Sequence, residues 1–175
     1  MANYLSKYYD MVSERERLGV EPLALNAEFT KELCELLLNP PVGSEQELLN
    51  LISNRVNPGV DESSKVKAQF LYEIASGKKV SVVISKQKAV ELLGNMKGGF
   101  NVSYLISLLE DESLALDAKM ALENTLLIYN AFDDVAALAD KGNNTAKELI
   151  KSWADATWFT SKSEYPKTVT LTVFK

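Results

Sequence analysis

Short stretches of helical spacing, each ended by a proline or glycine break, run through almost the whole sequence. Residues 2–18 place apolar side chains about one helical turn apart, and Gly19 provides a C-terminal stop. Asn26 predicts an N-cap for a second helix. That helix ends at 39–41, because the pair Pro40 and Pro41 cannot continue the backbone hydrogen bonds.

Further helix start and stop signals follow along the chain. Ser44 and Glu47 have the spacing of a capping box, as do Thr145 and Glu148. Asp61 predicts another helix start. The glycine-rich stretch 94–99 lacks the spacing of a phosphate-binding loop and follows a helix, so it predicts a tight turn between helices.

These breaks predict an all-α fold of seven to nine short helices, antiparallel because the connecting loops are short. Helix pairs separated by proline and glycine favour a HEAT-like α-solenoid or helical stack. No clean repeat at a fixed period is visible, so a compact irregular bundle stays open as an alternative. The segment 79–84 is β-prone by composition, and an extended connector is an alternative there.

One segment at the end of the sequence has the period of a strand. Residues 168–174 alternate apolar and polar side chains, and a single strand has nothing to pair with in a helical chain. We therefore expect residues 1–165 to form the helical domain and residues 166–175 to begin a following domain.

Histidine is absent from the sequence, and Cys34 is the only cysteine. Catalytic triads with histidine, histidine metal sites and imidazole bases are thereby excluded. One thiol cannot hold a zinc ion or an iron–sulfur cluster, which need three or four soft ligands. We predict no catalytic residue, no metal and no cofactor in this segment, which is not an enzyme by itself.

Composition and charge narrow the class of protein further. The net charge of −5 argues against a large basic surface for nucleic acid. Apolar runs are far too short to span a membrane, and the first residues lack the pattern of a secretory signal. A lone cysteine fits a reducing compartment, so we expect a cytoplasmic location.

Several side chains have both a structural and a functional interpretation. Cys34 lies beside leucines on a helix and is expected to be a buried, inert thiol. The acidic runs 110–112 and 133–134 could serve acid–base or metal chemistry, but adjacent carboxylates more often lie in solvent or at a helix N-terminus.

Aromatic and basic residues are the remaining candidates for binding. Trp153 continues a core face, whereas Trp158 and Phe159 belong either to the core or to an interface. A solvated face is the expected role of the basic residues, and a modest RNA-contact patch is the alternative. These basic residues are Arg55, Lys65, Lys67, Lys78 and Lys79.

Several long strings of residues resemble the N-terminal domain of the bacterial B-type aconitases, the bifunctional aconitate hydratase 2 and 2-methylisocitrate dehydratase family. The resemblance covers nearly the whole chain in family order, and the first thirty or so residues are only loosely similar. The matching strings are Leu38-Asn39-Pro40-Pro41, Ile52-Ser53-Asn54-Arg55-Val56-Asn57-Pro58-Gly59-Val60-Asp61, Val66-Lys67-Ala68-Gln69-Phe70-Leu71, Ala89-Val90-Glu91-Leu92-Leu93-Gly94-Asn95-Met96-Lys97-Gly98-Gly99-Phe100-Asn101, Lys151-Ser152-Trp153-Ala154-Asp155-Ala156-Thr157-Trp158-Phe159 and Leu171-Thr172-Val173-Phe174-Lys175.

The resemblance implies a HEAT-like domain of an enzyme that isomerises citrate to isocitrate through cis-aconitate at a 4Fe–4S cluster. In the family, the cluster cysteines and the substrate-binding residues lie in later domains, so no catalytic residue carries over to this chain. The leading domain lies near the active-site entrance and is associated with dimerisation, protein partners and mRNA binding.

Two functional interpretations follow. The chain is either a binding and assembly module of an aconitase or a free-standing adaptor for protein or RNA. The β-prone end favours the first, because a self-contained adaptor gains nothing from an exposed strand. The residues we expect at an interface are Trp158, Phe159, Gly98 and Gly99.

Overall fold

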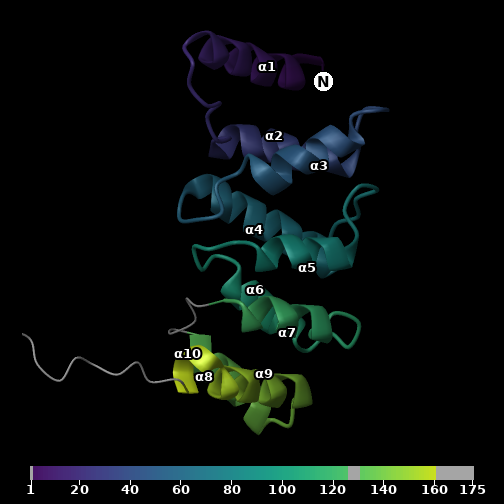
Figure 1. The fold of residues 1–175 in the computed structure, drawn as a ribbon. Coiled ribbons are helices and arrows are strands. Elements are labelled where there is room, and N and C mark those ends of the chain that lie inside the picture. Colours follow the sequence, from purple (N-terminus) through teal and green to yellow (C-terminus); the bar gives the residue numbers. More distant parts are fainter. Residues whose placement is uncertain (1, 126–130, 161–175) are drawn as a thin grey trace, which may run out of the picture.

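The helices stack into one column in the computed structural model, which describes residues 2–125 and 131–160 (Figure 1). Among these residues there are nine helices of seven residues or more and the single turn α10, which confirms the prediction of an all-helical stack. The strand predicted at 168–174 and the boundary at 165–166 lie outside the described residues. The helices are α1 (Ala2–Arg17), α2 (Ala27–Leu38), α3 (Glu45–Asn54), α4 (Glu62–Ala75), α5 (Lys86–Gly94), α6 (Val102–Leu108), α7 (Ala115–Glu123), α8 (Phe132–Asp140), α9 (Asn144–Asp155) and α10 (Thr157–Thr160).

Most of the helices form antiparallel pairs that pack in two rows. The pairs are α2 with α3, α4 with α5, α6 with α7, and α8 with α9. In one row α4 packs between α2 and α6, and in the other α7 packs between α5 and α9. This is the arrangement of an α-solenoid. The pairs begin at Ala27, Glu62, Val102 and Phe132, at unequal intervals, which explains why the sequence shows no fixed period.

The connecting loops gather on two opposite edges of the column (Figure 1). Loops within a pair, at 39–44, 76–85 and 109–114, form what we call the intra-repeat edge. Loops between successive pairs, at 55–61 and 95–101, form the inter-repeat edge together with the linker 18–26.

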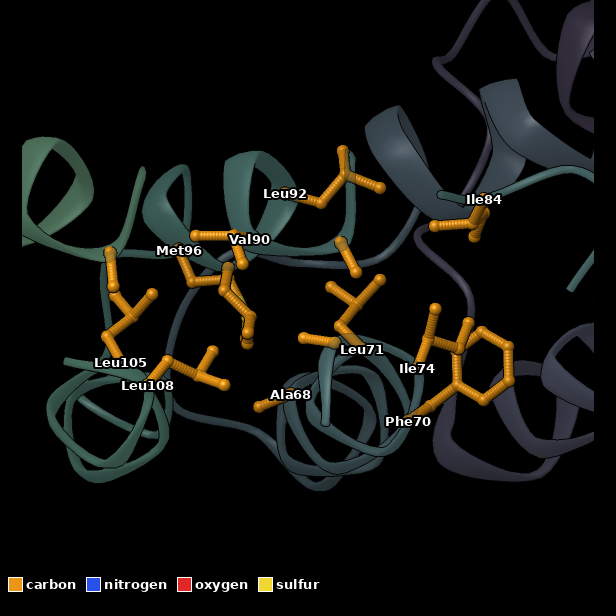
Figure 2. Packing of buried hydrophobic residues seen from close by; sticks show 14 of the residues in the cluster. Ala68, Phe70, Leu71, Ile74, Ile84, Val90, Leu92, Met96, Leu105 and Leu108 are labelled. Atoms are coloured by element: carbon orange, nitrogen blue, oxygen red, sulfur yellow. The ribbon is translucent and has the colours of Figure 1, made fainter. Parts of the chain in front are cut away.

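One apolar core runs along the column between the two rows. Figure 2 shows part of this core, in which α4, α5 and α6 contribute interlocking side chains. Leu71 on α4 and Leu105 on α6 are completely buried. Burial of a side chain of this size contributes about 1.5–3 kcal/mol to folding. Among the described helices, none is long and apolar enough to cross a membrane.

The helix ends follow the sequence signals only in part. Asn26 and Asp61 cap α2 and α4 as predicted, each accepting a hydrogen bond from a backbone N–H of the first turn. Both predicted capping boxes are wrong. The Ser44 hydroxyl donates to the Pro41 carbonyl and makes no cap, and α9 is capped by Asn143, which precedes Thr145.

Two further segments connect or close the stack. Helix α1 lies at the N-terminal end, where Tyr4 and Tyr8 are buried and the Tyr4 ring lies 5.5 Å from that of Phe29. The segment 79–84 is a connector with bends, and the β-prone composition there does not produce a strand.

Candidate interaction surface

The inter-repeat edge is built from loops that touch through their backbones. The Lys97 N–H donates to the Pro58 carbonyl at 2.6 Å. A Cβ atom on Gly98 would lie 1.8 Å from the carbonyl oxygen of Gly59, so only glycine fits there. Gly98 therefore has a packing role between two loops, and its role in an interface stays a prediction.

Gly99 has a different position on the same loop. Its φ of 87° lies in the left-handed region that favours glycine, and a Cβ added there would meet no atom within 4 Å. The open space beside Gly99 leaves the backbone of this loop accessible to another molecule. The stretch 94–99 is the tight interhelical turn that the sequence predicts.

Asn101, which the sequence analysis missed, holds this turn from inside. Its side chain is completely buried and donates from Nδ2 to the carbonyls of Leu93 (2.7 Å) and Met96 (3.5 Å). These carbonyls lie at and just beyond the C-terminal end of α5, where backbone carbonyls have no N–H partner within the helix. An asparagine shortly after a glycine-rich helix end is the only sequence signal for this role.

The linker 18–26 joins the same edge through Arg55. Its guanidinium Nη2 donates to the Pro22 carbonyl at 2.8 Å, and its carbonyl accepts from the Leu25 N–H at 2.8 Å. Four apolar side chains remain exposed on these loops: Leu18 (70%), Val20 (42%), Leu23 (54%) and Val60 (80%). The inter-repeat edge therefore combines a fixed backbone with uncovered apolar groups.

The aromatic candidates divide into described and undescribed side chains. Trp153 is buried, donates from Nε1 to the Leu122 carbonyl at 3.3 Å, and has its ring 6.0 Å from that of Phe132, which confirms its predicted place in the core. Trp158 and Phe159 belong to α10, which packs on α9. Their side chains lie outside the described residues, so the choice between core and interface stays open.

Cys34 is a buried thiol on α2, as predicted. Burial raises its pKa to about 12, so the thiolate that would react is scarce at neutral pH.

The predicted solvated face is confirmed for Lys65, Lys78 and Lys79, which are exposed, whereas Arg55 is half-buried and Lys67 is buried. Lys67 is only 3% exposed, and its Nζ donates to the Ser53 carbonyl at the end of α3 at 3.4 Å. Burial lowers its pKa to about 8. Lys79 pairs with Glu73 at 2.7 Å. The prediction was wrong for Lys67 because the free carbonyls at a helix C-terminus offer a cation a partner inside the protein.

The acidic runs have local structural partners. Asp111 accepts hydrogen bonds from the backbone and hydroxyl of Ser113, at 2.9 and 2.6 Å. Asp133 and Asp134 lie in the first turn of α8, where the helix dipole favours negative charge. In residues 2–125 and 131–160, no three acidic, cysteine or histidine side chains gather in a way that would hold a metal ion.

A groove of about 320 Å³ lies between α5 and α7 on the face of the second row. Its floor is tight, because a Cβ on Gly94 would lie 2.8 Å from the Cβ of Ala121. Glu91, one of its carboxylates, pairs with Lys88 at 2.7 Å. The groove holds no convergent set of acid, base and nucleophile. A second groove of about 260 Å³ lies between α2 and α4, where the Cys34 thiol has a raised pKa and Lys79 pairs with Glu73. Neither groove offers a catalytic set, so we look for function on the two edges.

Comparison with known proteins identifies the family. Residues 7–159 match the family described as the Aconitate B N-terminal domain. The chain belongs to this family. It is 53% identical over 171 residues to aconitate hydratase B of Pseudomonas aeruginosa, 50% identical over 173 residues to that of Synechocystis, and 47% identical over 171 residues to that of Escherichia coli.

These matches cover nearly all of this chain but only a small part of each relative. Each match covers 98% of this chain but only 20% of the relative. The chain thus spans about one fifth of the length of the aconitate hydratases that it resembles.

Proposed function

We propose that this chain is the leading helical domain of a longer cytoplasmic aconitate hydratase and that it serves assembly rather than chemistry. The observation that carries the proposal is the match of residues 7–159 to the Aconitate B N-terminal domain, together with relatives named aconitate hydratase B that are about five times as long. Their length favours this proposal over a free-standing adaptor. A reading frame that stops after Lys175 would favour the adaptor instead.

The 4Fe–4S cluster of such an enzyme does not fit the donors of this chain. A cluster of this type needs three or four thiolates. The whole sequence has one cysteine, and Cys34 is buried with a raised pKa. We therefore assign the cluster and the reaction on cis-aconitate to the part of the enzyme that lies outside this chain.

Among the roles implied by the family, we favour protein contact, as a dimer or with a partner, over mRNA binding. Exposed Leu18, Leu23 and Val60 on a fixed edge are typical of a protein interface. A nucleic-acid surface needs free cations, whereas Lys67 is buried and Lys79 is paired. Control of access to the active site is compatible with the same docking.

The test is sedimentation equilibrium of the full-length protein over a concentration series. The variant Leu23→Asp/Val60→Asp places charge on the inter-repeat edge, and Leu116→Asp places it on helix α7, outside both edges, as the matched control. All three side chains are exposed, so both variants are expected to fold. We expect the first variant to weaken self-association or partner binding by about tenfold or more, with the control unchanged.

Hydration of cis-aconitate, measured per assembled cluster, separates assembly from chemistry. We expect both variants to keep the turnover of the natural protein. Unchanged association combined with a large loss of turnover in the first variant would overturn the proposal. The proposal would also be overturned if the natural protein and both variants associated equally with themselves and with every tested partner.

A further inference from the structure

Three valines on the intra-repeat edge are almost completely uncovered. Val42 is fully exposed, Val80 is 81% exposed and Val82 is 80% exposed. Among the large apolar side chains of the described residues, only Val60 on the opposite edge reaches the same exposure. The loops that carry the three valines project from the same side of the column (Figure 1).

The loop that presents Val80 and Val82 is held in place by the residue between them. The Ser81 hydroxyl donates to the Leu37 carbonyl at 2.6 Å and accepts from the N–H groups of Val83 (3.1 Å) and Ile84 (3.2 Å). The Ser81 side chain is therefore turned toward the protein while its neighbours are exposed. A loop fixed in this way loses little conformational freedom on binding.

The bond from Ser81 also ties this loop to the end of α2, from which the 39–44 loop continues. Leu37 lies in the last turn of α2, a few residues before Val42. Pro40 and Pro41 stiffen the backbone that leads to Val42. We call Val42, Val80 and Val82 the valine patch.

The next loop along the same edge is acidic. Glu110 and Glu112 are exposed and Asp111 is partly exposed. The two lysines beside the valine patch already have partners in this chain: Lys79 pairs with Glu73, and the Lys78 amine lies 5.1 Å from the centre of the Tyr72 ring. A surface that complements this edge would be apolar opposite the valines and basic opposite residues 110–112.

We propose that the valine patch docks on the part of the same polypeptide that follows residue 175, with basic side chains of that part facing residues 110–112. The inference rests on the proposed function, because it requires the longer chain. The relatives supply the candidate occupant, since about four fifths of their length lies outside the match. A second copy fits less well, because the lysines beside its own valine patch are already engaged.

The test is cross-linking of the full-length protein with an amine-reactive reagent, followed by mass spectrometry. An equal mixture of ¹⁴N- and ¹⁵N-labelled protein separates links within one molecule from links between two. Lys78 reports on the intra-repeat edge, and Lys97 is the matched exposed lysine on the inter-repeat edge. We expect Lys78 to link to lysines beyond residue 175 of its own molecule.

Substitutions test whether the valine patch is needed for docking on the part that follows residue 175. Val80→Asp/Val82→Asp is expected to reduce the Lys78 links by about tenfold or more, and Val60→Asp is expected to leave them unchanged. Equal effects of the two variants would overturn the proposal, as would Lys78 links formed only between molecules. The proposal also fails if Lys97 links to the following part and Lys78 does not, in which case the assembly role stands. If no lysine of the stack links to any other polypeptide, the assembly role itself fails.

Discussion

The two edges of the column connect their loops by different means. On the inter-repeat edge, loops meet backbone to backbone, through Lys97 with Pro58 and through Leu25 with Arg55. On the intra-repeat edge, side chains make the connections: the Ser81 hydroxyl donates to the Leu37 carbonyl at the end of α2, and the Asn143 amide, in the loop between α8 and α9, donates to the Leu109 carbonyl. Loops between pairs set how one pair stacks on the next, so they must approach closely. Loops within a pair only close a hairpin, which leaves their side chains free for exposed valines or acidic residues.

The largest expected effect tests the backbone contact of the inter-repeat edge. In Gly98→Ala, the new methyl group would collide with the backbone of Gly59, which cannot move away as a flexible side chain would. We expect the free energy of unfolding to fall by about 3 kcal/mol or more, measured by equilibrium denaturation in urea. Gly99→Ala is the control, with open space but a positive φ, and about 1 kcal/mol of loss. Equal losses would show that the close approach is unimportant.

A second prediction concerns the buried amine of Lys67, whose burial lowers the free energy of unfolding. Lys67→Met is expected to raise the free energy of unfolding by about 2 kcal/mol at pH 7, because burial of the charged form lowers the Lys67 pKa from 10.5 to about 8. Between these values the unfolded chain binds more protons, so the stability contributed at this site rises with pH.

Denaturation of both proteins at pH 7 and pH 10 checks this prediction. The advantage of the methionine variant should shrink at pH 10, where the folded protein holds Lys67 neutral. A variant that is less stable at both values would show that the bond to Ser53 outweighs the cost of burial.

The Asp61 cap of α4, on the inter-repeat edge, allows a smaller test. Although partial burial acts to raise the Asp61 pKa, hydrogen bonds from Asn57, Ser64 and Ser63 lower it well below its ordinary value. Asp61→Ala should cost about 1.5 kcal/mol at neutral pH. Because the folded pKa is depressed, this contribution is present above about pH 4 and is lost as pH falls further. A difference between variant and natural protein that stays constant from pH 7 to pH 2.5 would contradict the assignment.

The smallest effect is expected on the intra-repeat edge. Ser81→Ala removes three hydrogen bonds of a loop that water can partly reach, so the loss should be about 1 kcal/mol. Hydrogen exchange should accelerate at the amides of Val83 and Ile84, with little change at Lys97. Faster exchange at both edges would mean that the edges are not independent.

The sequence predicted the features that depend on local signals. The caps at Asn26 and Asp61, the buried Cys34 and the core position of Trp153 follow from residue type and helical spacing. The contact of Gly98 with Gly59 has no local signal, because the two residues belong to loops on either side of a helix pair. Pairings of this kind depend on how the pairs stack, which no short pattern encodes.

Two errors have specific physical causes. Lys67 has the helical spacing of the core residues Leu71 and Ile74, so the period indicated burial, and the general preference of lysine for solvent misled the prediction. The Ser44 capping box does not form because the serine hydroxyl donates to the Pro41 carbonyl of the preceding turn. Both residues satisfy a carbonyl group that a sequence pattern does not display.

The packing of each pair mainly on the next pair has a mechanical consequence. The principal contacts among the described helices join a helix to its own partner or to the neighbouring pair, and none of these contacts links the two ends of the column. A load applied at the ends passes through the interfaces one after another, and their small displacements add, as in springs connected in series. The column is therefore an elastic element, more compliant along its length than a domain of the same mass with a single central core.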